Sequence, residues 1–296
     1  MLTAVGCAHV ESGEYAAGRV YLEQSRQIFH ELGRHRGESV ALGNLGEALI
    51  HQGDYAAARE HLEAALRLYR LTGDRRNEGW ALGNLGVAAM QLGDYPAARA
   101  YHQQARDMAR RTGDRNTEGL ALVDLGLIAH QLGDDALALD LGEQALRGAT
   151  AAFTRIRALL LVGHALSGLG RLPEAADKYA QANDAGRAAG LCSRAVEATA
   201  GLARVAQARG DIPAALGLVG PLVDRLSPDT VIGADEPLRV FLTCYGVLRS
   251  AGDPRAQAVL SAARDLLRAR ASQIADEAQR RAFLEGVPAH RAIMAE

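Results

Sequence analysis

Lysine is almost missing from this chain of 296 residues, in which Lys178 is the only lysine among 33 basic residues. A phosphate-binding P-loop needs a lysine directly before serine or threonine, and Lys178 is followed by Tyr179. That class of nucleotide site is therefore excluded. The preference for arginine indicates the codon usage of a GC-rich, bacterial genome. Acidic residues nearly balance the basic ones at a net charge of −2, which gives no general attraction to nucleic acids or anionic membranes.

Cysteines, aromatic side chains and long apolar stretches are scarce as well. Cys7, Cys192 and Cys244 are scattered without the spacing of a metal site or a disulfide framework, as is typical of a reducing cytoplasm. No stretch resembles a signal peptide or is apolar for long enough to cross a bilayer, so we expect a cytoplasmic protein. Only 4% of the residues are aromatic although 48% are hydrophobic, which predicts an interior of alanine and leucine between closely packed helices.

Two short patterns resemble catalytic motifs, and neither is convincing. His30 and His35 are five residues apart rather than the four of a zinc-binding helix, and a glycine lies between them. Ser39 resembles half of a nucleophile elbow, but no strand precedes it, and its neighbour Glu38 recurs 40 residues later as Glu78. With no combination of nucleophile, base and orienting group, we expect a non-catalytic protein without metal or cofactor.

The chain is rich in one feature, a repeat of about 40 residues. The sequence ALGNLG begins at Ala41 and again at Ala81, and Gly-Asp-Tyr begins at Gly53 and again at Gly93. A fixed period of this length predicts stacked two-helix units, each too small to bury its apolar face alone. The glycine between the two helices recurs in steps of 40, 40, 40, 37, 40 and 42 residues, which predicts seven units: Gly13, Gly53, Gly93, Gly133, Gly170, Gly210 and Gly252.

Within each unit, turn and contact residues recur at fixed places. A turn glycine such as Gly93 can adopt the left-handed conformation that ends a helix, and Asp94 can cap the next one. The same interpretation applies to the other aspartates that follow turn glycines: Asp54, Asp134, Asp211 and Asp253. Gly86 and Ala98 also recur in register. Because glycine inside a helix costs about 1 kcal/mol relative to alanine, its repetition predicts close contact between neighbouring helices.

These residues resemble the pattern of the tetratricopeptide repeat (TPR) family. In the third unit the matching positions are Leu85, Gly86, Ala89, Tyr95, Ala98 and Ala105. The resemblance extends from about Leu2 to Arg270 and is most specific in the first four units. The 40-residue period is longer than the usual 34 and is similar to that of kinesin light chains, Pins-type adaptors and the C-terminal arrays of bacterial STAND-type regulators.

The resemblance implies an all-α, right-handed superhelix of about seven helical hairpins with a C-terminal capping helix. We expect one continuous solenoid domain. Repeats one to six occupy residues 1–226, beginning with a shortened helix, and an irregular seventh hairpin and cap occupy residues 227–296. The residues from Ser227 to Pro237 form an insertion between the sixth and seventh units.

In the TPR family the first helices of successive units line a concave groove, and the resemblance assigns a peptide-binding groove to this chain. Its residues are Asn44, Glu47, Ile50, His51, Trp80, Asn84, Val87, Met90, Gln91, Asp124, Leu127, His130, Arg157, His164, Arg204, Arg239 and Arg249. The first half is apolar with a row formed by Asn44, Asn84 and Asp124, and side-chain amides can hold the backbone of an extended peptide. The second half is cationic. Each assignment has a structural alternative: the asparagines could bridge helices, Trp80 could belong to the core, and the arginines could simply be solvated.

The sequence thus favours an interaction scaffold that binds a peptide or partner segment in its groove, with an acidic end of the ligand at the arginines. We expect no direct binding of nucleic acid and no membrane association. The alternative is a sensor or autoinhibitory arm of a larger bacterial transcriptional or signalling regulator. The short first helix and the closing sequence FLEGVPAHRAIM favour that alternative.

Overall fold

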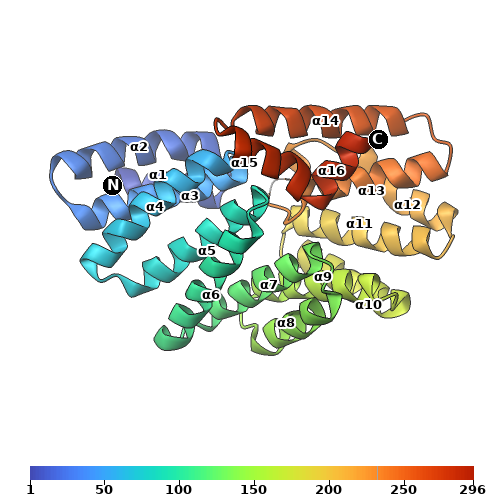
Figure 1. Cartoon of the computed structure of the whole chain (residues 1–296), viewed down its shortest axis with the longest axis horizontal. Helices are drawn as coiled ribbons and strands as arrows, with labels where there is room; N and C mark the ends of the chain where they lie inside the picture. Colours follow the sequence, from blue (N-terminus) through green and yellow to red (C-terminus); the bar gives the residue numbers. More distant parts are fainter. Residues whose placement is uncertain (232) are drawn as a thin grey trace. The chain divides into compact units, whose positions relative to one another are not determined.

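The computed structural model describes residues 1–231 and 233–296, which form helices and connecting turns without a strand among them. Seven helical pairs follow one another along the chain (Figure 1): α1 Leu2–Glu11 and α2 Tyr15–Glu31; α3 His35–Gln52 and α4 Tyr55–Thr72; α5 Arg75–Gln91 and α6 Tyr95–Thr112; α7 Arg115–Gln131 and α8 Asp135–Gly148; α9 Ala152–Gly168 and α10 Leu172–Ala188; α11 Cys192–Ala208 and α12 Ile212–Val223; α13 Pro237–Ser250 and α14 Ala256–Ser272. The remaining elements are η1 Asp229–Val231, α15 Glu277–Arg281, the π-helical turn η2 Ala282–Gly286 and α16 Pro288–Ala295. The prediction of an all-α helical repeat is confirmed.

The helices form two compact units. Unit 1 comprises Met1–Ala121 and Gln273–Ala282, and unit 2 comprises Leu122–Ser272 and Phe283–Glu296, so the boundary falls within α7. In unit 1, leucines and alanines of α3 to α6 form much of the buried core, among them Leu62 and Leu85 at 0% exposure. The core of unit 2 is built around α9, α10 and α11. Small apolar side chains fill both interiors, as the composition predicts.

The turns have the geometry that the repeat predicts. All seven glycines between paired helices have positive φ, from 67° to 84°, which an L-residue with a side chain rarely adopts. Four of the five predicted capping aspartates accept a hydrogen bond from the backbone amide three residues on, at 3.0–3.2 Å: Asp54, Asp94, Asp134 and Asp211. Asp253 differs, because α14 begins only at Ala256 and its carboxylate binds the amide and guanidinium of Arg255.

Close contacts between paired helices explain two of the glycines inside the first helices. A Cβ atom on Gly46 would lie 2.4 Å from Cγ of Leu62, and one on Gly86 would lie 2.5 Å from the ring of His102. Both distances are far shorter than a van der Waals contact, so a side chain at either glycine would push the paired helix away. The cost of glycine in a helix is thus offset by the close approach of a large side chain from its partner.

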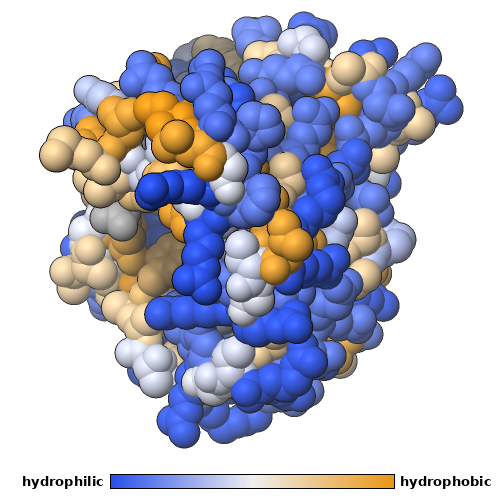
Figure 2. Space-filling view, turned by 90° about the vertical axis from the view of Figure 1, so that its left-hand side faces the viewer, coloured by the Kyte–Doolittle hydropathy of each residue, from blue (hydrophilic) through white to orange (hydrophobic). Residues whose placement is uncertain are grey.

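Polar side chains cover much of one face of the repeat (Figure 2). Figure 2 shows an end view in which hydrophilic side chains predominate and apolar ones gather in smaller patches. Among the described residues, no helix combines the length and the apolar character needed to cross a bilayer.

The register of unit 1 can be tested at Ala98, which is completely buried on α6. Replacing Ala98 by Leu inserts three carbon atoms into a packed contact, and we expect a loss of unfolding free energy of about 1–3 kcal/mol. The matched control is Ala100→Leu, because Ala100 lies on the same helix and is exposed. Urea denaturation followed by circular dichroism measures both variants. Equal stability of the two would contradict the assigned register.

Candidate functional site

Most of the first half of the predicted groove lies on unit 1, on α3 and α5, whereas its members on α7, namely Asp124, Leu127 and His130, belong to unit 2. Eight of the members in unit 1 are half-buried, which places them at the edge of the core with part of each side chain accessible: Asn44, Glu47, Ile50, His51, Trp80, Asn84, Val87 and Gln91. Met90 is instead buried, with 8% of its surface exposed, so it contributes mainly to the core. We call the accessible surface of α3 and α5 around Asn44 and Asn84 the amide face.

Trp80 belongs partly to the core and partly to this face. It packs against a buried cluster that includes Leu42 and Tyr69, and a Cβ atom on Gly43 would lie 2.7 Å from its ring. The ring therefore lies directly on the backbone of α3. The remainder of the side chain is accessible, so both interpretations of Trp80 apply to different parts of the same ring.

The two asparagines of the amide face differ in their hydrogen bonds. Asn44 donates from Nδ2 to the carbonyl of Val40, one turn earlier in its own helix, at 2.8 Å. The Nδ2 atom of Asn84 is buried and has no hydrogen-bond partner in the structure. A buried amide donor without a partner costs about 1–3 kcal/mol, so an added acceptor at Nδ2 of Asn84 would be stabilising.

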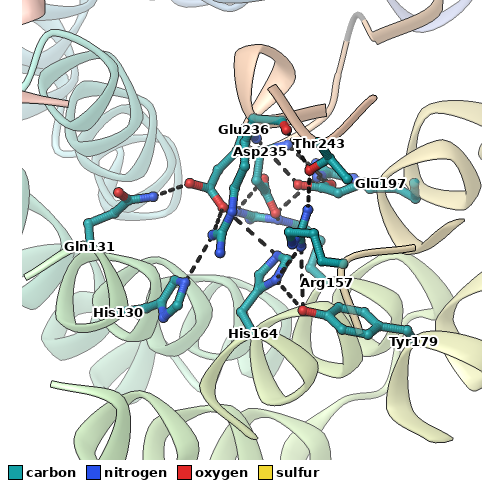
Figure 3. A network of polar contacts seen from close by, with 12 residues as sticks. His130, Gln131, Arg157, His164, Tyr179, Glu197, Asp235, Glu236 and Thr243 are labelled. Atoms are coloured by element: carbon teal, nitrogen blue, oxygen red, sulfur yellow. Dashed lines mark hydrogen bonds and ion pairs between the residues drawn. The ribbon is translucent and has the colours of Figure 1, made fainter. Parts of the chain in front are cut away.

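The second half of the predicted groove lies in unit 2, where it forms a network of charged side chains (Figure 3). Successive first helices supply it, because residues seven apart share one face of a helix: Arg157 and His164 on α9, and Glu197 and Arg204 on α11. The loop between α12 and α13 completes the network. We call its residues 227–236 the acidic loop, because it ends in Asp235 and Glu236.

Arg157 is at the centre of this network and is only 6% exposed. Its Nη2 atom binds Asp124 at 2.5 Å and Asp235 at 2.8 Å, and its Nε donates to Asp235 at 3.1 Å. Burial alone would lower the pKa of Arg157, but the carboxylates of Asp124 and Asp235 outweigh it and raise this pKa. Asp124 therefore neutralises a buried cation instead of extending the row of side-chain amides.

Arg194 and Glu197 hold the acidic loop from α11. Arg194 binds Asp235 at 2.9 Å and Glu197 at 3.1 Å, and the backbone amides of Asp235 and Glu236 each donate to Glu197 at 3.3 Å. Burial, and then the neighbouring carboxylate of Asp235, raise the pKa of Glu197 to about 7 although Arg194 acts against this. The loop is thus bound through its main chain as well as through its side chains.

Glu236 enters the network from the end of the same loop. It binds Arg239 at 2.6 Å and accepts a hydrogen bond from Gln131. Arg239 also donates to Nε2 of His130 at 2.9 Å, which assigns the proton of that ring to Nδ1 and makes it a donor to Asp135 at 2.5 Å. Burial and then Arg239 lower the pKa of His130 below its ordinary value, which fits a neutral ring.

Tyr179 of α10 fixes the position of His164. Its ring fills the space beside Gly163 and Gly201, where a Cβ atom would lie within 2.7 Å of ring carbons. Its hydroxyl lies 2.7 Å from Nδ1 of His164, to which Arg204 also points at 3.3 Å. The Nε2 atom of His164 is buried without a hydrogen bond, and the nearest carboxylate oxygen, on Glu236, is 3.9 Å away. Burial, and then Arg239 and Arg204, hold the pKa of this ring well below its ordinary value.

The structure differs from the expectation that the arginines either await a ligand or are solvated. Arg157 is buried, Arg204 and Arg239 are half-buried, and all three bind groups of their own chain. Arg249 alone of the predicted arginines is exposed, and it binds Glu296 at 2.6 Å. Leu127 is only 2% exposed and belongs to the core.

Sequence reasoning missed the charged residues Arg194, Asp235 and Glu236, and it also missed Gln131, Asp135 and Tyr179, which bind members of the network. The i, i+3 spacing of Arg194 and Glu197 in the sequence could have indicated Arg194. The inserted Asp-Glu-Pro before a predicted helix could have indicated Asp235 and Glu236. Among the described residues, no three His, Cys, Asp or Glu side chains are grouped so that they could hold a metal ion.

Comparison with known proteins supports the repeat assignment. Residues 1–71 and 77–151 match the model of a family described as tetratricopeptide repeat, and residues 196–220 match a second model of the same description. No curated protein sequence matches the chain.

Several solved structures share the fold at low identity. One is the Rap conjugation gene regulator of plasmid pLS20 in complex with the Phr* peptide, with 14% identity, a TM-score of 0.72, and coverage of 93% of this chain and 76% of that chain. NprR in complex with its cognate peptide NprX has 13% identity, a TM-score of 0.69, and coverage of 98% and 85%. A putative kinesin light chain from Podospora anserina has 17% identity, a TM-score of 0.51, and coverage of 64% and 94%. At these identities the similarity concerns the fold alone.

The raised pKa of Glu197 predicts a pH-dependent stability of unit 2. Between pH 4.5 and 7 the folded chain keeps a proton on Glu197 that the unfolded chain loses, so this contribution is complete below about pH 4.5 and is lost as the pH rises through about 7. Each pKa unit corresponds to about 1.4 kcal/mol. We therefore expect the unfolding free energy of the native chain, relative to Glu197→Gln, to fall by about 2–3 kcal/mol between pH 5 and pH 8.

Urea denaturation at pH 5, 6, 7 and 8 measures this difference. The lowered pKa values of His130 and His164 act in both chains, so their effect largely cancels in the comparison. The control is Glu174→Gln, because Glu174 is an exposed glutamate on α10. A Glu197→Gln chain with the same pH profile as the native chain would refute the assignment.

Proposed function

Because this chain belongs to the tetratricopeptide repeat family, we propose that it is a non-catalytic scaffold that binds an extended peptide or partner segment on the amide face of unit 1. The observation that carries the proposal is the buried Nδ2 atom of Asn84, which has no hydrogen-bond partner. A carbonyl group of a ligand backbone would supply the missing acceptor. Since main-chain carbonyls recur along any peptide, this contact recognises an extended segment without selecting its sequence.

Apolar side chains around Asn84 supply the surface for ligand side chains. Ile50, Trp80 and Val87 are each half-buried, so each keeps accessible apolar area that a ligand could cover. Covering such area contributes about 25 cal/mol for each Å² removed from water. We therefore propose that the backbone of the ligand is held at Asn84 and that its apolar side chains contact these three residues.

Two of the structural matches are consistent with this proposal. One is a complex of NprR with its cognate peptide NprX, and the other is a complex of a Rap regulator with the Phr* peptide. Those ligands belong to those proteins, and they support a peptide as the class of ligand for this chain.

A second candidate function is that of a sensor arm in a bacterial regulator. It is favoured by the same comparisons, in which one match is named a conjugation gene regulator and another a quorum sensor. The two candidates agree on peptide binding and differ in the consequence of binding. In a sensor arm, binding changes the stability of elements away from the amide face, which hydrogen exchange measures residue by residue.

The amide face can be tested by selecting short peptides that bind the full chain and titrating them calorimetrically. We expect Asn84→Ala to weaken binding by about 1–3 kcal/mol, which corresponds to a 5- to 150-fold higher Kd, because the ligand carbonyl loses its donor in a desolvated place. Folding stability should not fall through a lost Nδ2 hydrogen bond, since that atom has no partner in the free chain. The matched control is Gln103→Ala, which removes an exposed amide from α6.

Peptides that bind Asn84→Ala and the native chain equally would exclude the amide face as the site. If Gln103→Ala instead weakens binding, the ligand occupies the outer helices. If both variants bind the peptides as tightly as the native chain does, neither the surface around Asn84 nor the surface around Gln103 is the binding site.

A further inference from the structure

The acidic loop places two adjacent carboxylates at the positions where the sequence predicts those of a ligand. Asp235 binds Arg157 and Arg194 at 2.8–2.9 Å, and Glu236 binds Arg239 at 2.6 Å. These arginines belong to the first helices of successive hairpins, whereas the loop is an insertion outside the repeat. The repeat therefore forms a cationic site, and a separate segment of the same chain fills it.

Without the loop, the helices carry more positive than negative charge in the network. Its four arginines, on α9, α11 and α13, face four carboxylates, two of which belong to the loop: Arg157, Arg194, Arg204 and Arg239 face Asp124, Glu197, Asp235 and Glu236. Without the loop carboxylates the helices would present an excess of positive charge. An anionic segment is therefore the class of group that this surface requires.

The contacts also have the form of peptide recognition. Glu197 accepts from two consecutive backbone amides, those of Asp235 and Glu236, while arginines bind the two side chains. A ligand held in this way is recognised by its main chain and by a pair of adjacent acidic residues. Any extended segment with two neighbouring carboxylates can make the same contacts, because none of them depends on the rest of the loop.

The loop does not satisfy the site completely. Nε2 of His164 is buried without a hydrogen bond, and the Glu236 oxygen that faces it is 3.9 Å away, which is too far for one. His164 itself is 1% exposed, so bulk water does not reach this donor. An incoming carboxylate that approaches more closely would gain a hydrogen bond that the loop does not make.

We propose that Arg157, Arg194 and Glu197 form a binding site for a pair of adjacent acidic residues in an extended peptide, and that Asp235 and Glu236 are its internal occupant. The acidic loop thus competes with a ligand for the site. This inference names a second ligand-binding surface, separate from the amide face, and it rests on the proposed function only for the peptide nature of the ligand.

Exchange of the loop for a ligand requires only a short segment to move. Val231 is completely buried and holds the first part of the loop, whereas Gly233, two residues before Asp235, has a φ of +85° and can adopt backbone conformations that other residues rarely adopt. Buried ion pairs contribute little net stability because desolvation cancels much of their attraction, so replacing one carboxylate pair by another is nearly balanced. An external ligand must, however, overcome the high effective concentration of a tethered occupant.

The experiment uses the full chain and a fluorescein-labelled, end-blocked hexapeptide with the sequence of residues 233–238, Gly-Ala-Asp-Glu-Pro-Leu. In the double variant Asp235→Asn, Glu236→Gln the internal carboxylates are replaced by amides of the same shape. We expect this variant to bind the peptide at least about tenfold more tightly than the native chain in fluorescence anisotropy. Binding should weaken as NaCl increases, because salt screens the attraction between the acidic peptide and the arginines of the site. The control peptide, Gly-Ala-Asn-Gln-Pro-Leu, should not bind.

A second variant keeps every charged residue of the site. Insertion of six Gly and Ser residues after Gly233 lengthens the tether and lowers the effective concentration of the internal pair, so we expect tighter peptide binding than in the native chain. If the double variant does not fold, the insertion variant still tests whether the loop competes with the peptide. Equal binding of the acidic and neutral peptides, or no gain over the native chain in a folded variant, would overturn the proposal. Asn84→Ala should leave binding of the hexapeptide unchanged, so failure here and failure of the amide face are separate results.

Discussion

Four hairpins of this protein, the first, second, third and fifth, share one close approach, at which the backbone of the first helix touches a large side chain of the second helix. Gly46 receives Leu62, Gly86 receives His102, and Gly163 receives Tyr179. Because the contact has no room for a side chain on the first helix, it fixes both the distance and the rotation of the pair. The chemistry of the inner surface depends on that rotation, since it determines which residues of the first helices remain accessible.

In unit 2 the same contact also orients the polar network. Tyr179 fits between two glycines of successive first helices, and its hydroxyl then lies beside His164 and Arg204. Packing against the two glycines therefore fixes the position of the Tyr179 ring, and its hydroxyl in turn orients His164 and Arg204. The buried guanidinium of Arg157 adds a second requirement, because a charge that is removed from water must be paired. Asp124 meets part of that requirement from the repeat, and Asp235 meets the rest from outside it.

The fold could be predicted from the sequence because its determinants are local and periodic. Turn glycines such as Gly93 and caps such as Asp94 act within a few residues, and their spacing shows the number of hairpins. The charged network could be predicted only in part. The repeat identifies Arg157 as an inner-face residue, but the carboxylate of Asp235 is 78 residues away in an irregular segment. No period relates the two, so their contact is a property of the three-dimensional structure alone.

The use of arginine instead of lysine determines which groups in the charged network of unit 2 can gain or lose a proton. A buried lysine can release its proton and become neutral, whereas a guanidinium stays charged under all physiological conditions. The centre of the network at Arg157 therefore carries a permanent charge, and protons can enter or leave only through its carboxylates and imidazoles. The arginine at this place thus gives the interior a fixed cation, to which every other charge in the network must adjust.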